Sequence, residues 1–200
     1  LLALVLLAFP VIEWARVSYL AVQWPTILYD ASRVLAVLGF VVLFFQYVLA
    51  SRVRAFESSL GLDRLIQAHR KTGIAALALL FLHGALYSSY ELALGFLTLG
   101  WQKLLGIGAL VLLIVVAGAA ILWKSLGWRY ETWKRIHYAS YVILPLGFLH
   151  ALLLGTTVNS SLVTRIYFIV LLALYVLVVA SRIAKRLQVR ANPYTVSDVR

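Results

Sequence analysis

The chain has 200 residues, of which 64% are hydrophobic and only 12% are charged. Soluble domains carry about 45–50% apolar and about 25% charged residues, so this composition indicates a membrane protein with several spans. The net charge of +11 does not indicate nucleic-acid binding, because the basic residues lie between long apolar runs rather than along one polar face. Cysteine and methionine are both absent, which excludes a thiolate-held iron–sulfur cluster and any Cys or Met axial ligand to a metal.

Membrane spans are the first feature that can be placed along the chain. A transmembrane helix needs about 20 mostly apolar residues. Six segments fit this requirement, at residues 1–20, 31–51, 63–94, 103–126, 131–154 and 161–187. The first of them is interrupted by Pro10, Glu13 and Arg16. We therefore predict an all-α fold, an integral membrane bundle of six transmembrane helices within residues 1–190.

The last ten residues differ in character from the rest of the chain. A basic helix end is followed by a break at Asn192-Pro193, and "YTVSDV" then alternates apolar and polar residues. Such alternation is typical of a strand. We interpret residues 191–200 as a linker and the first strand of a further domain that is missing from this chain.

The basic residues predict the orientation of the bundle in the membrane. Cytoplasmic loops of membrane proteins carry an excess of Lys and Arg. With both termini in the cytoplasm, four basic residues lie outside, namely Arg16, Arg33, Lys103 and Arg165. The remaining 14 lie inside, namely Arg52, Arg54, Arg64, Arg70, Lys71, Lys124, Arg129, Lys134, Arg135, Arg182, Lys185, Arg186, Arg190 and Arg200. This asymmetry favours cytoplasmic termini.

All four histidines fall on two of the predicted spans: His69 and His83 on the third, His137 and His150 on the fifth. These spans run in the same direction, so His69 and His137 share the cytoplasmic end and His83 and His150 the outer end. At about 1.5 Å per residue, the histidines on each span are about 20–21 Å apart. Each facing pair can hold one iron, so the pattern predicts two bis-histidine haems stacked across the bilayer. A lone membrane histidine is more often a hydrogen-bonded packing residue, but four at matched depths favour ligation.

Helical geometry fits one of these spacings better than the other. At about 100° per residue, His83 lies about 40° from His69, whereas His150 lies about 140° from His137 on an ideal helix. Pro145 lies between the second two. Proline kinks a helix, so it could bring both side chains onto one face.

Three further residues are candidates for the environment of the haems. Gly73 and Gly147 share helix faces with His69 and His150, where they would leave room for a flat macrocycle or serve only as packing residues. Arg33 starts the second span on the outer side, where basic residues are few. It could anchor the helix at the interface or pair with the propionates of the outer haem.

The motifs "AHRKTG…LH" and "WKRIHYASYVILPLGFLH" bring a known family into view. Over residues 31–190 the chain resembles the ferric-reductase-like transmembrane domain, which NADPH oxidases and ferric reductases share. The resemblance implies that the iron ligands of two b-type haems are His69, His83, His137 and His150. It also implies that Arg33 corresponds to an arginine that meets a haem propionate in the oxidases. The tail is similar to the start of the family's flavin-binding barrel, which a nicotinamide-binding domain follows.

Two positions depart from the pattern of the family. Some members place an aromatic residue six positions after the first histidine of the fifth span, where this chain has Ile143. Phagocyte-type oxidases carry a further histidine one turn after the outer ligand of the third span, where this chain has Tyr87. These departures concern the route between the haems and the terminal acceptor.

The function implied by the resemblance is that of an oxidoreductase of the NADPH oxidase or ferric reductase type. FAD reduced by NADPH, in a cytoplasmic domain of the same gene, would donate electrons through two haem b groups. Oxygen, giving superoxide, or ferric iron would accept them outside. The expected location is the plasma (inner) membrane, with the lipid bilayer and no nucleic acid as partner.

Three alternatives stay open: a haem subunit of a methionine sulfoxide reductase system, a respiratory-type cytochrome b, and a non-redox membrane protein.

Overall fold

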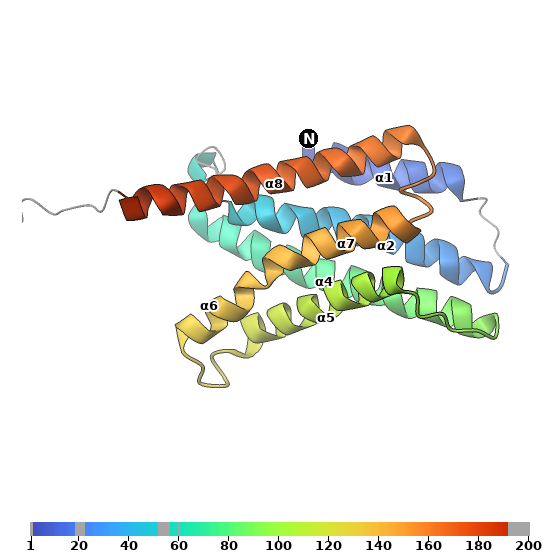
Figure 1. Cartoon of the computed structure of the whole chain (residues 1–200), viewed down its shortest axis with the longest axis horizontal. Helices are drawn as coiled ribbons and strands as arrows, with labels where there is room; N and C mark the ends of the chain where they lie inside the picture. The colour runs from blue at the N-terminus through green and yellow to red at the C-terminus, as the bar shows by residue number, and fades with distance from the viewer. Residues whose placement is uncertain (1, 19–22, 52–56, 60, 192–200) are drawn as a thin grey trace, which may run out of the picture.

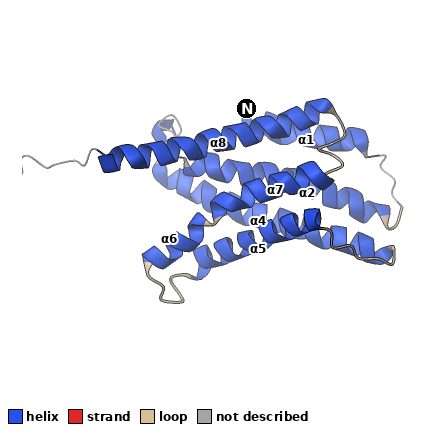
Figure 2. Cartoon of the chain, in the orientation of Figure 1, coloured by secondary structure: helices blue, strands red, loops and turns tan. Residues whose placement is uncertain are grey.

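The described part of the chain forms a bundle of helices joined by loops and turns. The structure is a computed structural model that describes residues 2–18, 23–51, 57–59 and 61–191. All regular secondary structure in these ranges is helical, which confirms the predicted all-α class (Figure 2). The helices are α1 (Leu2–Val17), α2 (Thr26–Ala50), α4 (Leu62–Ala93), α5 (Trp101–Leu122), α6 (Tyr130–Tyr138), α7 (Ser140–Leu154) and α8 (Leu162–Ala191). The strand predicted near the C-terminus lies outside the described residues.

Five of the six predicted spans are supported by length and composition. Among the described residues, α2, α4, α5, α6 together with α7, and α8 are long and apolar enough to cross a membrane. Helix α1 has 16 residues, so at about 1.5 Å per residue it extends about 24 Å, less than the roughly 30 Å hydrocarbon core. The chain is therefore a multi-pass membrane protein, and a sixth span stays a prediction.

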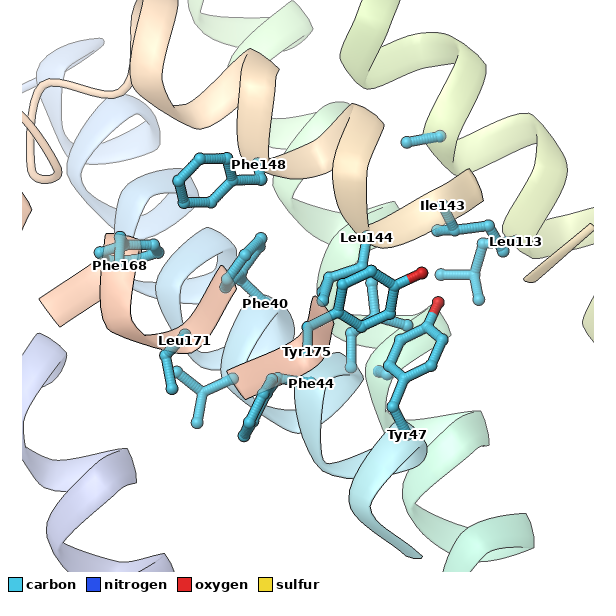
Figure 3. Packing of buried hydrophobic residues seen from close by; sticks show 14 of the residues in the cluster. Phe40, Phe44, Tyr47, Leu113, Ile143, Leu144, Phe148, Phe168, Leu171 and Tyr175 are labelled. Carbon is cyan, nitrogen blue, oxygen red and sulfur yellow. The ribbon is translucent and has the colours of Figure 1, made fainter. Parts of the chain in front are cut away.

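Helix α2 lies in the middle of the bundle (Figure 1) and contacts α1, α4, α7 and α8. Its second half is apolar on every side, and a helix of this kind is normally buried by neighbouring helices. Figure 3 shows its aromatic side chains packed against those of α7 and α8. Phe40 of α2 meets Phe168 of α8 with ring centroids 5.1 Å apart. The core thus forms around α2 and fixes the positions of the helices that surround it.

Helices α2 and α4 approach each other closely because one contact residue has no side chain. A Cβ placed on Gly39 would lie 2.8 Å from Cγ of Leu80. In membranes, where lipid is as apolar as a leucine side chain, small residues at helix contacts drive association by close packing. Gly39 therefore brings α4, and with it two of the four histidines, against the central helix.

The fifth predicted span is divided into two helices at Ala139. Helix α6 ends at Tyr138 and α7 begins at Ser140, and the direction of the chain changes between them (Figure 1). Pro145 lies inside α7 and has no N–H to donate to the carbonyl of Tyr141. The hydroxyl of Tyr175 donates to that carbonyl instead, and the hydroxyl of Tyr47 donates to the carbonyl of Ser140. Two tyrosines from neighbouring helices thus hold the start of α7.

Candidate functional site

The structure brings the four histidines together as two facing pairs. The ring centroids of His69 on α4 and His137 on α6 are 6.3 Å apart, with the ring planes at 65°. The ring centroids of His83 on α4 and His150 on α7 are 6.4 Å apart, with the planes at 61°. The division of the fifth span at Ala139 lets both its histidines face α4, although 13 residues of ideal helix would turn them apart.

The separation within each pair matches that of two imidazoles on opposite sides of one metal ion. A metal–imidazole bond is about 2.0–2.1 Å, and the ring centroid lies about 1.1 Å beyond the nitrogen, so two trans ligands have centroids about 6.2–6.4 Å apart. Direct hydrogen bonding between the rings would bring them closer than this. In the described part of the chain, no cluster of three or more His, Cys, Asp or Glu residues could hold a metal by itself.

We call His83 and His150 the outer pair and His69 and His137 the inner pair, after the orientation predicted from the sequence. The outer pair is held in the tautomer that a metal ligand requires. Nδ1 of His83 lies 2.9 Å from the backbone carbonyl oxygen of Ser32. Nδ1 of His150 lies 3.0 Å from the carbonyl oxygen of Gln102. A carbonyl oxygen only accepts hydrogen bonds, so Nδ1 must carry the proton in each ring. Nε2 of a neutral imidazole then keeps its lone pair, and this nitrogen is the one available to a metal.

The inner pair is supported differently. The side-chain amide of Gln46, on α2, reaches within 3.1 Å of Nδ1 of His69. In the orientation that satisfies both ends of the amide, its nitrogen donates to the backbone oxygen of His69 at 2.8 Å and to Nδ1 of His69 at 3.1 Å, while its oxygen accepts from Oγ1 of Thr72 at 2.6 Å. Nδ1 of His137 is buried and has no hydrogen-bond partner among the described residues. The indole of Trp133 stacks on His137 instead, with ring centroids 5.3 Å apart and planes at 27°.

A cavity of about 300 Å³ opens beside the outer pair. It is lined by residues of α2, α4, α5, α7 and α8 and by the loop between α7 and α8, so most of the bundle contributes to it. His83 and His150 both lie on its wall, together with Ile143 and Gly147. The polar lining of the cavity includes Arg33.

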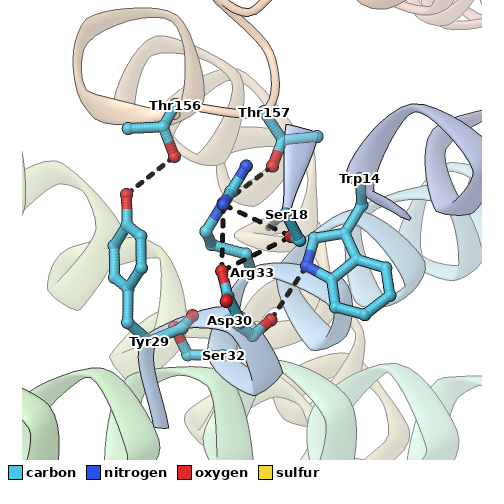
Figure 4. Close-up of polar contacts among 8 residues, drawn as sticks. All are labelled: Trp14, Ser18, Tyr29, Asp30, Ser32, Arg33, Thr156 and Thr157. Atoms are coloured by element: carbon cyan, nitrogen blue, oxygen red, sulfur yellow. Dashed lines mark hydrogen bonds and ion pairs between the residues drawn. The ribbon is translucent and has the colours of Figure 1, made fainter. Parts of the chain in front are cut away.

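Arg33 is held at the wall of this cavity by a polar network (Figure 4). Its Nη1 lies 3.1 Å from Oδ1 of Asp30, and its Nε donates to Oγ1 of Thr157 at 3.1 Å. Asp30 in turn receives the indole N–H of Trp14 on its backbone oxygen at 2.9 Å. Nη2 of Arg33 is buried without a partner among the described residues. This unused donor, on a side chain that is 11% exposed, fits an anionic group inside the cavity.

A second cation lies at the rim of the same cavity. Lys103, on α5, forms an ion pair with Glu91, on α4, whose side chain is only 2% exposed. The ammonium also donates to the backbone oxygen of Thr98 at 2.7 Å. It lies 5.0 Å from the ring centroid of Tyr87, one helical turn beyond His83. These contacts fasten the outer ends of α4 and α5 and leave the rim with two basic side chains.

Comparison with known proteins identifies the family. The sequence profile described as "ferric reductase like transmembrane component" matches residues 35–148, which is more than half of the chain. The chain belongs to the ferric reductase-like transmembrane family. No curated protein and no solved structure matches it significantly. Family membership and five candidate spans together support a role as a membrane component of the oxidoreductase type.

The matched segment of this ferric reductase-like domain contains most of the candidate site. His69, His83 and His137 lie within it, His150 follows its end by two residues, and Arg33 precedes its start by two. The two glycines that the sequence singled out have different surroundings. Gly147 lies on the cavity wall, whereas a Cβ on Gly73 would lie 3.3 Å from Oε1 of Gln46.

Sequence reasoning missed several residues of the ferric reductase-like site. Gly106 of α5 packs directly against His150, since a Cβ there would lie 2.8 Å from two atoms of the imidazole. Gln46 was also missed. It is a polar residue in an apolar part of the second span, and this signal could have pointed to a polar partner nearby. Trp133 stands four residues before His137 in the motif "WKRIHYASYVILPLGFLH", and this spacing of one helical turn could have indicated that the two side chains touch.

Proposed function

We propose that this domain carries single electrons across the membrane through two b-type haems. One haem would be held by His69 and His137 near the cytoplasmic side, the other by His83 and His150 near the outer side. The donor would be FAD reduced by NADPH, in a cytoplasmic domain encoded by the same gene. The acceptor outside would be oxygen, giving superoxide, or ferric iron. The domain would lie in the plasma membrane with both termini in the cytoplasm.

The observation that carries this proposal is the pairing of the histidines at trans-ligand distance. Two nitrogen ligands per site leave the equatorial positions of a metal unfilled, and a porphyrin supplies a plane of four nitrogens. The chain has no Cys or Met, so the paired histidines are its strongest candidates for haem ligands. A haem held by two histidines would supply a one-electron carrier.

The residues of the chain have distinct roles in this proposal. Ser32 and Gln102 accept hydrogen bonds from Nδ1–H of the outer histidines with their backbone carbonyls, which leaves Nε2 of each ring available to a metal. The free Nη2 of Arg33 would bind a haem propionate inside the cavity. With His83 and His150 both holding the iron, the outer acceptor would be reduced at the edge of the site. Arg33 and Lys103 both line the cavity, and each is paired with a carboxylate, that of Asp30 and that of Glu91 respectively.

An absorption spectrum tests the proposal directly. The purified chain should contain two haems per molecule and show a b-type α band on reduction with dithionite. NADPH alone should not reduce these haems, because the proposed flavin and nicotinamide domains are not part of the 200 residues. A haem-free protein from cells supplied with haem would contradict the proposal, and so would rapid reduction by NADPH.

Replacing Arg33 with leucine should weaken the outer site and leave the inner site intact. A hydrogen bond to a charged group contributes about 1.5–3 kcal/mol, so outer-haem retention should fall about 10- to 100-fold and its midpoint potential should fall as well. Redox titration that resolves two steps measures both effects. Arg165→Leu is the matched control, because Arg165 is exposed and is not among the residues that line the cavity.

A second variant distinguishes the loss of Arg33 itself from the effect of leaving the carboxylate of Asp30 without its ion-pair partner. Asp30→Asn combined with Arg33→Leu removes both charges of the pair. If the double variant recovers the original potential and haem content, Arg33 serves only to neutralise Asp30, and the propionate assignment is wrong.

A further inference from the structure

We propose that Trp133 is a positioning residue for His137, whose ring plane it fixes by stacking rather than by a hydrogen bond. This inference rests on the proposed function, because it treats His137 as a haem ligand. It goes beyond that function by assigning the orientation of one ligand to a residue that does not itself touch the metal site.

His137 differs from the other three histidines in the support of its Nδ1. His83 and His150 donate to backbone carbonyls, and the amide of Gln46 reaches His69. Nδ1 of His137 is buried and has no hydrogen-bond partner in the described ranges. A metal-bound histidine is normally oriented by the hydrogen bond of its second nitrogen. For His137, another contact has to supply this orientation.

The indole of Trp133 is placed to supply it. Trp133 precedes His137 by four residues on α6, so the two side chains lie on one face of the helix. Their ring centroids are 5.3 Å apart and their planes differ by 27°, which is a stacked arrangement. Helix α6 ends one residue after His137.

Trp133 is itself held by two further aromatic rings. The indole of Trp123, at the end of α5, stacks on it with centroids 5.7 Å apart and planes at 29°. Tyr130 lies against it with centroids 5.3 Å apart. The three rings Trp123, Trp133 and His137 therefore form one column that links the end of α5 to the inner histidine pair. Nε1 of Trp133 is buried without a partner among the described residues, so the indole is held by its ring faces and not by its N–H.

The ring plane of an axial imidazole affects the properties of the iron that it binds. In bis-imidazole haems, the angle between the two ligand planes governs the anisotropy of the ferric electron paramagnetic resonance (EPR) signal. The planes of His69 and His137 stand at 65°. If Trp133 sets the plane of His137, its removal should let this angle vary and change the signal of the inner haem alone.

EPR spectroscopy of the oxidised full chain, with both haems bound, tests this role. His137→Ala first identifies the inner signal by its loss. Trp133→Leu should then shift and broaden the largest g value of that signal and leave the outer signal unchanged. Trp133→Phe should restore the original signal, because a phenyl ring still stacks and the indole N–H makes no bond. Trp128→Leu is the control, since Trp128 lies in the loop before α6 and is 38% exposed.

Haem release gives a second readout. Loss of a supporting residue around a metal site typically weakens binding about 10- to 100-fold, so transfer of the inner haem to an apo-globin acceptor should accelerate by a similar factor in Trp133→Leu. If this variant does not fold, Trp123→Leu removes the ring that stacks on Trp133 and should shift the inner EPR signal in the same way.

The outcomes separate the two proposals. Wild-type protein without haem signals would overturn the haem function and this inference together. Two normal haem signals that stay unchanged in Trp133→Leu, or in Trp123→Leu where the former does not fold, would overturn the role of Trp133 alone. A Trp133→Phe variant that behaves like Trp133→Leu would also overturn it, because ring stacking would then not be the determinant.

Discussion

Replacing either His83 or His150 with alanine is expected to remove one and the same haem, the outer one. Each variant should retain a single haem per chain, because the remaining ring of the pair cannot hold the iron from one side alone with comparable affinity. His69→Ala and His137→Ala should likewise each remove only the inner haem. The reason is the pairing in the structure, where the ring centroids are 6.4 Å apart in the outer pair and 6.3 Å in the inner pair.

Haem stoichiometry and redox titration of the four variants measure this result. Added imidazole should restore the missing haem, since it can occupy the space left by the deleted ring and act as the lost ligand. Restoration would show that the variant has lost a ligand and not its fold. If His83→Ala and His137→Ala remove one common haem, the pairing across α4 and the fifth span is wrong.

A single methyl group on Gly106 is expected to empty the outer site. A Cβ at this position would lie 2.8 Å from Cε1 and Nδ1 of His150 and 2.9 Å from its Cγ. Real contacts of this kind are never so short, so the imidazole has to move. Movement would lengthen the bond from Nδ1 to the carbonyl of Gln102 and misdirect Nε2. Disturbed support of a ligand commonly costs about 10- to 100-fold in metal affinity, so Gly106→Ala should lose most of its outer haem.

Gly108→Ala is the matched control for this experiment. Gly108 lies on the same helix, but a Cβ there meets nothing within 4 Å. Alanine is favoured over glycine inside a helix by about 0.5–1 kcal/mol, so the control should keep both haems and unfold no more easily than the original protein. The measurement is the number of haems per chain together with the spectrum of the reduced outer haem. Equal haem content in the two variants would show that His150 tolerates the shift.

Much of the fold could be predicted because the bilayer sets strong limits on span length and composition. The third span was expected at residues 63–94 and α4 runs from Leu62 to Ala93. The division at Ala139 was not predicted at that position. Proline drew attention to residue 145, but the interruption depends on hydroxyl groups of Tyr47 and Tyr175, which come from distant parts of the chain. Such non-local contacts leave no periodic signal in the sequence.

The candidate site was predictable to a similar degree. Depth along the helices followed from spacing, which predicted that His69 pairs with His137 and His83 with His150. Spacing did not predict that His137 and His150 face the same way, because that depends on the division of the span at Ala139. The supports of these rings were not visible, because the acceptors for the outer pair are backbone carbonyls of Ser32 and Gln102. Every residue carries such a carbonyl, so side-chain identity does not reveal which one is used. Gly106 was missed for a related reason, since its contact with His150 joins two helices that only the fold brings together.

The use of backbone carbonyls at one site and side chains at the other has an evolutionary consequence. A point mutation changes a side chain but keeps the peptide carbonyl, so no ordinary substitution of Ser32 or Gln102 deletes the acceptor that orients an outer ring. Alanine scanning would pass over both positions. Gln46 and Trp133, by contrast, can be exchanged in a single step. The supports of the His69–His137 pair are therefore open to change by single substitutions at these two positions, whereas the two carbonyl supports of the His83–His150 pair are not.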